Sequence, residues 1–156
     1  MAAQPFDTRA GFQAQLDTLL GRARASLQMF DPDFGWWELG STRTDALLRA
    51  FLRGGGRLQL VAHSNHRLER DAPRFLTLLG DYRHLIDCRV TSRSLKGLTD
   101  SFCIGDGHDI VRRFHADFFR GEADFDAPSS TQTSLERYQA IWAESMPGLH
   151  ANVTGL

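Results

Sequence analysis

The sequence contains few cysteines and no long apolar run. Its two cysteines, Cys88 and Cys103, each lie inside a segment of alternating apolar residues. This placement favours buried, reduced thiols in a cytoplasmic protein, because a disulfide would require the two segments to be neighbouring strands. The chain starts without a basic segment leading into a long apolar one, and no uncharged window reaches membrane-spanning length. We therefore expect neither a secretory leader nor a membrane partner.

Lysine is also scarce, since Lys96 is the only one among 18 basic residues. These are balanced by 19 acidic residues, which gives a formal net charge of -1. A domain that binds nucleic acid through a broad electrostatic surface carries a basic excess, so we do not expect a nucleic-acid partner. The composition is 42% hydrophobic and 24% charged, which is typical of a globular protein, and we expect residues 1–156 to form a single domain.

Hydrophobic spacing predicts helices that alternate with strands in the first part of the chain. The helices are expected to begin at Asp7, at a capping box in 42–45 and near Pro73. Segments 26–31, 58–62 and 86–90 have the apolar content of strands. The glycines at 54–56 precede a strand, so we interpret them as a helix end and not as a phosphate-binding loop.

Residues 99–117 predict a β-hairpin. The turn is assigned to Asp106 and Gly107, because this dipeptide readily adopts the positive φ angles of a tight hairpin. We expect a mobile segment over 115–128, a last helix that starts at Ser129 or Ser130, and a final edge strand over 149–156.

This order of elements predicts the fold class. Repeated βα alternation favours an α/β single domain with a mixed, largely parallel sheet, helices on both faces and an antiparallel hairpin. In the loop after the first strand, paired tryptophans at Trp36 and Trp37 are typical of either a binding platform or the cover of a core, and we favour the second.

The same order is similar to one phospholipase D-like domain. The segments "ARASLQMFD" and "LLRAFLRGGGRLQLVA" resemble that family's strand entry and its helix–glycine–strand unit. The sequence also resembles a bacterial family of unknown function that sometimes accompanies acetyltransferase domains. The resemblance covers most of the chain and implies a phospholipase D-like fold.

The residues that perform the chemistry of phospholipase D-like enzymes are not at the matching positions. The family signature is H-x-K, then Asp after four residues, then Gly-Ser after six more. When its aspartate is aligned with Asp106, Thr99 takes the place of the histidine and Ser101 that of the lysine, while Arg113 and Phe114 replace Gly-Ser. In the family, the histidine attacks phosphorus and the lysine neutralises the phosphate oxygens. The resemblance therefore implies a degenerate domain without catalytic residues.

Four other side chains form a candidate anion cleft: Arg113, His115, His63 and Arg112. Arginine forks bind phosphate or carboxylate, and His63 follows a strand at the edge where α/β sheets bind ligands. Arg112 and Arg113 should face opposite sides of a regular strand. The one in the cleft either binds an anion or pairs with an acidic neighbour such as Asp106.

His63-x-x-His66 resembles half of a metal site, but a third ligand is missing from the pattern. We interpret this pair as part of a solvated loop and expect neither a metal nor another cofactor.

The leading hypothesis is a non-catalytic phospholipase D-like module that binds an unknown ligand or partner. The alternative is a phosphoryl-group enzyme that uses relocated histidines and arginines. Single-copy relatives in the resembling family build one active site from two chains, so a homodimer is one expected partner; an anionic small molecule and another protein are the others.

Overall fold

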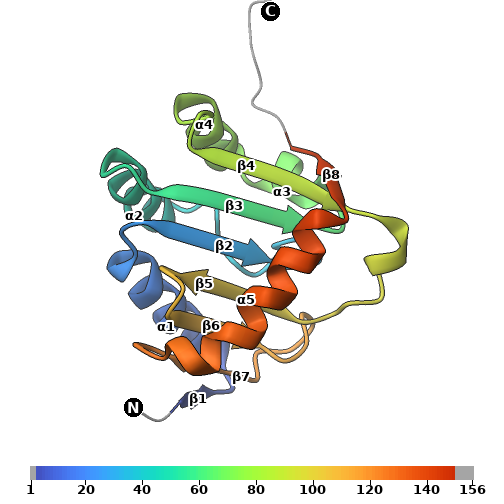
Figure 1. The fold of residues 1–156 in the computed structure, drawn as a ribbon. Helices are drawn as coiled ribbons and strands as arrows, with labels where there is room; N and C mark the ends of the chain where they lie inside the picture. Colours follow the sequence, from blue (N-terminus) through green and yellow to red (C-terminus); the bar gives the residue numbers. More distant parts are fainter. Residues whose placement is uncertain (1–2, 150–156) are drawn as a thin grey trace, which may run out of the picture.

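The computed structural model describes residues 3–149, which form one mixed α/β domain around an eight-stranded sheet (Figure 1). The strand order is β1-β7-β6-β5-β2-β3-β4-β8. The strands are β1 (Gln4–Phe6), β2 (Ser26–Phe30), β3 (Arg57–Ala62), β4 (Ile86–Thr91), β5 (Ser101–Gly105), β6 (Asp109–Arg113), β7 (Gly121–Asp124) and β8 (Ser145–Pro147).

Helices cover both faces of the sheet, as predicted. In Figure 1, α5 crosses the front face alone, and α1 and α2 lie behind the sheet. The helices are α1 (Arg9–Arg22), α2 (Thr42–Arg53), α3 (His66–Asp71), α4 (Pro73–Asp81) and α5 (Pro128–Ala143), with a short 3-10 helix η1 (Arg93–Leu95). Helix α3 is a correction, because we expected its first residues to belong to a polar loop.

The prediction of a largely parallel sheet is wrong. Only β2–β3 and β3–β4 are parallel pairs, and the other five neighbouring pairs are antiparallel. The error arises mainly from segment 115–128, which we expected to be a mobile loop. It contains β7, a four-residue strand that pairs with both β6 and β1. Its short sequence, Gly-Glu-Ala-Asp, has no apolar alternation to reveal a strand.

Three helix starts differ from the expected ones, and the last helix, α5, begins at Pro128 and not at Ser129 or Ser130. Thr8, and not Asp7, caps α1, since its hydroxyl accepts a hydrogen bond from the amide of Gly11 at 3.0 Å. Ser41 caps α2 by accepting from the amide of Thr44 at 3.1 Å. The helix end at 54–56 is confirmed, because Gly54 is the C-cap of α2.

The hairpin turn at Asp106 and Gly107 is confirmed. Their φ angles are 54° and 74°, the left-handed values that a tight turn requires. The Asp106 carboxylate also accepts hydrogen bonds from the backbone amides of Arg24, Ala25 and Ser26 at 3.0, 2.7 and 3.0 Å. The turn is thereby joined to the start of β2.

The apolar core is divided between the two faces of the sheet. Phe12 and Trp37 belong to the larger part, beneath α1, and Phe30 and Tyr138 belong to the smaller part, beneath α5. Trp37 is fully buried, as a core cover should be, whereas Trp36 is 38% exposed.

Cys88 and Cys103 cannot form a disulfide in this fold. They lie on β4 and β5, and two other strands, β2 and β3, separate these in the sheet. Burial raises the pKa of Cys88 to about 12 and raises that of Cys103 as well, so both thiols stay protonated at neutral pH.

The edge strand that the structure describes near the end of the chain precedes the segment in which we expected one. The described edge strand, β8, ends at Pro147, and the expected segment 149–156 lies outside the described residues except for Leu149. Within residues 3–149 we find no helix with the length and apolar character needed to cross a membrane.

Candidate functional site

A buried ion pair joins the ends of β2 and β6. The Nη2 atom of Arg113 lies 2.9 Å from Oδ1 of Asp31, and each side chain is only 1% exposed. Asp31 is the residue directly after the apolar strand β2, and its carboxylate therefore lies at the end of that strand, next to the larger part of the core. An unpaired charge at this depth would be very unfavourable, so each partner requires the other.

The carboxylate of Asp31 is surrounded by hydrogen-bond donors. Its Oδ2 accepts from the backbone amides of Asp33 and Phe34 at 2.9 and 2.6 Å, and its Oδ1 accepts from Nε1 of Trp37 at 3.2 Å. Burial raises the pKa of Asp31, while its hydrogen bonds and the charge of Arg113 act in the opposite direction. These donors hold the loop after β2 in place.

Ser101, which we aligned with the family's lysine in the sequence, belongs to the same cluster. Its Oγ accepts hydrogen bonds from Nε1 of Trp37 at 3.1 Å and from Nη2 of Arg113 at 3.4 Å. The serine is fully buried. The positive charge next to Ser101 is therefore that of Arg113 on β6, and this guanidinium pairs with the buried carboxylate of Asp31.

The other half of the Arg113 guanidinium holds the β6–β7 loop, residues 114–120. Its Nη1 donates to the carbonyls of Ala116 at 2.6 Å and Phe118 at 3.4 Å. The guanidinium also lies over the ring of Phe12, 4.7 Å from its centroid. Burial lowers the pKa of Arg113, Asp31 opposes that shift, and the side chain remains charged. Arg113 thus fixes the backbone of the loop from within the protein.

The loop presents exposed aromatic side chains to solvent. Phe114 is 49% exposed and Phe118 is 64% exposed, and Trp36 contacts Phe119 of the same loop at 5.2 Å between ring centroids. Arg9 lies 5.1 Å above the Trp36 ring. We call Trp36, Phe114 and Phe118 the aromatic surface. Exposed aromatic groups held on a rigid frame are typical of binding surfaces.

The structure does not bring the four predicted anion-binding residues into one cleft. Arg113 lies beneath α1 in the buried pair, and it pairs with Asp31, not with Asp106. Arg112 points to the α5 face, as the alternation predicted, where it contacts Glu122 at 3.5 Å and Ser134 at 3.5 Å.

The two histidines also lie apart. His63 is held on the α5 side, with Nδ1 2.6 Å from the Thr91 hydroxyl and Nε2 2.7 Å from the carbonyl of Leu98. Both ring nitrogens therefore have protein partners. His115 lies in the β6–β7 loop, and its Nδ1 accepts from the amide of Asp117 at 3.1 Å.

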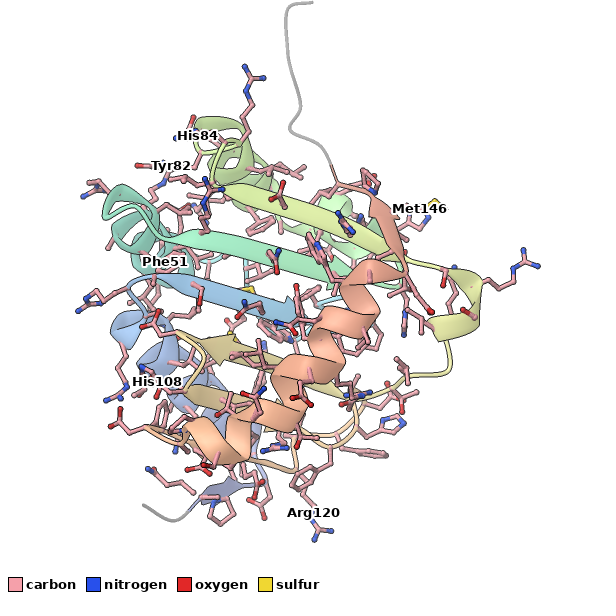
Figure 2. The ribbon with its side chains drawn as sticks, in the orientation of Figure 1. Phe51, Tyr82, His84, His108, Arg120 and Met146 are labelled. Atoms are coloured by element: carbon pink, nitrogen blue, oxygen red, sulfur yellow. The ribbon has the colours of Figure 1, made fainter. Side chains whose placement is uncertain are left out.

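A second polar cluster lies at the hairpin turn. His108, Asp109 and Asp126 bring three possible metal-ligand atoms within 4.8 Å of one another, and Figure 2 shows His108 beside the turn. Arg22 already pairs with both carboxylates, at 3.0 and 2.9 Å. Burial acts to raise the pKa of Asp109, but the hydrogen bonds from Arg22 and from the amide of Asp126 outweigh it and lower that pKa. This cluster is an internal salt-bridge network.

The sequence reasoning missed Asp31 as a site residue. The available signal was an Asp-Pro-Asp segment directly after an apolar strand, at the edge where α/β sheets place functional groups. No spacing rule connects it to Arg113, which lies 82 residues later.

The sheet and its covering helices form a fold similar to that of phospholipase D family members. The structure of a phospholipase D family member, Nuc from Salmonella typhimurium, matches with a TM-score of 0.71 and 15% identity, covering 94% of this chain and 97% of Nuc. NucT from Helicobacter pylori matches with a TM-score of 0.66 and 12% identity, covering 94% and 99%. At these identities the similarity concerns the fold alone.

Within that fold, the chain belongs to the family described as "Domain of unknown function (DUF7931)", which matches residues 8–151. No curated protein matches the sequence.

A further structural neighbour corrects one expectation. TrmBL2, an archaeal chromatin protein described as showing a novel mode of DNA binding, has a TM-score of 0.69 and 9% identity, covering 95% of this chain and 55% of TrmBL2. Because a protein with this fold binds DNA, the expectation that nucleic acid is not a partner is not supported.

Proposed function

We propose that this chain is a non-catalytic phospholipase D-like domain that acts as a binding or interaction module. The observation that carries the proposal is the buried Arg113–Asp31 pair. It uses the cation of the former catalytic region as a structural anchor, in contact with the serine that replaces the family's lysine. A phosphate bound there would have to displace an internal carboxylate from a well-formed ion pair, which is unfavourable.

The nucleophile position supports the same proposal. Thr99 is exposed and precedes β5, and its carbonyl accepts a hydrogen bond from the amide of Ala116 at 2.6 Å. A threonine hydroxyl needs an adjacent general base to attack phosphorus. His63 is the histidine held by Thr91 and Leu98, so its ring nitrogens are not free to serve Thr99.

The aromatic surface is the part of the molecule that we assign to binding. Arg113 holds the backbone of its loop, so the exposed rings lose little conformational freedom when a partner binds. A second copy of the chain is the partner that we propose first, because the surface combines large aromatic groups with arginines, the composition of interface hot spots.

One observation favours the alternative of a relocated phosphoryl-transfer enzyme. His115 is half exposed, its Nδ1 is oriented by the amide of Asp117, and its other ring nitrogen has no hydrogen-bond partner within residues 3–149. Such a histidine has the geometry of a general base or nucleophile.

Phosphodiester turnover by the purified chain tests the proposal. We expect no hydrolysis of a chromogenic phosphodiester, single-stranded DNA or double-stranded DNA above the buffer rate. The panel contains the wild type, His115→Ala and Thr99→Ala. Turnover that is lost in His115→Ala and retained in Thr99→Ala would overturn the proposal and establish the relocated enzyme.

A further inference from the structure

A pocket of about 390 Å³ lies between β1 and the base of the β6–β7 loop. Pro5, Phe6 and Asp7 line one side of it, and Phe114, Arg120 and Glu122 line the other. This volume is within the range of small-molecule sites. The pocket is separate from the Arg113–Asp31 cluster, and of the aromatic surface it includes only Phe114.

Aromatic rings supply the apolar part of this pocket. Phe6 is buried and Phe114 is 49% exposed, and both residues line the pocket. The close approach of Phe6 to β7 depends on Gly121. A Cβ at that position would lie 2.8 Å from Cζ of Phe6 and 1.9 Å from the carbonyl oxygen of Arg112.

The pocket also has one uncommitted charge of each sign. Glu122 is engaged by Arg112 at 3.5 Å. Arg120 and Asp7 form no ion pair with any residue in the described range 3–149. Figure 2 shows the Arg120 side chain extending freely from the β1–β7 end of the sheet. Its guanidinium can therefore turn to a ligand without breaking an internal contact.

We propose that this pocket binds a zwitterionic α-amino acid with an aromatic or large aliphatic side chain. The ligand's carboxylate pairs with Arg120, its ammonium group pairs with Asp7, and its side chain packs on Phe6 and Phe114. A simple anion would face Asp7, and a simple cation would face Arg120. A ligand that carries both charges next to an apolar group satisfies all the lining groups at once.

The ligand panel separates the three parts of this recognition. L-Phenylalanine, N-acetyl-L-phenylalanine, L-phenylalaninamide and L-alanine are titrated into the full chain by calorimetry and by amide NMR. We expect millimolar binding of L-phenylalanine, roughly three- to tenfold weaker binding of each blocked analogue, and no binding of L-alanine. The NMR shifts should centre on Phe6, Phe114 and Gly121.

Two variants then assign each charge to its residue. Arg120→Gln should weaken L-phenylalanine binding but leave the affinity for phenylalaninamide unchanged, since this analogue has no carboxylate. Asp7→Asn should weaken L-phenylalanine binding but leave that for the N-acetyl analogue unchanged. Arg9→Gln is the control, because Arg9 is an exposed arginine outside the pocket, and it should bind as the wild type does.

Equal affinity for all three phenylalanine derivatives would overturn the proposal, as would no binding at ten millimolar ligand. So would an unchanged pattern in both pocket variants. Retained thermal unfolding curves confirm that these surface variants are folded. Ligand binding tests the amino-acid site, and phosphodiester turnover tests the proposed function. Either proposal can therefore fail without the other.

Discussion

The Nη2 atom of Arg113 and Oδ1 of Asp31 lie 2.9 Å apart at the end of the central strands, and both side chains are buried. Through this pair, the position that holds a small residue in the resembling family becomes a structural anchor. The same guanidinium holds the β6–β7 loop by its carbonyls, so the buried ion pair also supports the loop that carries the exposed rings of Phe114 and Phe118.

Breaking this ion pair should strongly destabilise the fold. Arg113→Met leaves the Asp31 charge buried and unpaired, and we expect a loss of about 3–5 kcal/mol in the free energy of unfolding. Arg112→Met is the matched control on the neighbouring position, where the side chain is only half buried, and should cost about 1 kcal/mol or less. Urea denaturation measures both. In the double variant Arg113→Met/Asp31→Asn, part of the loss should be recovered. Equal losses in the two single variants would contradict the structural role of the pair.

Acid should weaken the contact between the hairpin turn and β2. Burial acts to raise the pKa of Asp106, but hydrogen bonds from the amides of Ala25, Ser26 and Arg24 outweigh it and lower that pKa below 3.8. An aspartate with a lowered folded pKa contributes stability that is present above its unfolded pKa and lost as pH falls through its folded pKa. Stability should therefore fall below about pH 4, and Asp106→Asn should flatten this decline.

Urea unfolding between pH 2 and pH 7 measures that acid dependence. Asparagine tolerates the left-handed backbone at this position, so Asp106→Asn changes mainly the charge. Gly107→Ala is the control in the same turn, since its φ of 74° makes alanine unfavourable while the charge is kept. It should cost about 1 kcal/mol at every pH and retain the wild-type acid slope. An acid slope in Asp106→Asn as steep as in the wild type would rule out this account.

The aromatic surface should govern self-association. We expect the wild type to form a twofold dimer, and Phe118→Ser should weaken it about tenfold because Phe118, at 64%, is the most exposed aromatic side chain of the β6–β7 loop and would leave water on association. Met146→Ser is the control: Met146 is similarly exposed, at 62%, but lies on edge strand β8 at the other end of the sheet (Figure 2). Light scattering over a concentration series gives the dissociation constants. A wild type that stays monomeric at high concentration, or equal effects of the two variants, would refute self-association through the aromatic surface.

Neither cysteine should react in the folded protein. Because burial raises the pKa of Cys88 to about 12, labelling by a thiol reagent at pH 8 should occur only when the protein unfolds. The thiols ionise near pH 9 in the unfolded chain, so stability should also decline as pH rises from about 9 toward 12. Labelling rates measured with and without urea test the first point. Rapid labelling of one thiol in native protein would show that its strand opens locally.

Several local features were predictable because neighbouring residues determine them. The turn at Asp106 and Gly107 follows from the few residue types that adopt positive φ, and the glycine-rich end of α2 follows from the same rule. The helices were also largely predictable, since apolar spacing along one segment defines the face that packs. The opposite orientations of Arg112 and Arg113 required only the alternation of side chains along a strand.

The sheet and the candidate site depended on contacts between distant segments. Strand β7 is too short and polar to be recognised alone, and it exists because β6 and β1 supply its hydrogen-bond partners. The sequence did not identify which acidic residue pairs with Arg113, because several acidic residues lie closer to it along the chain than Asp31 does. Only the tertiary structure brings Asp31 to Arg113, since β2 and β6 have their C-terminal ends on the same side of the sheet. Neither charge can remain buried alone.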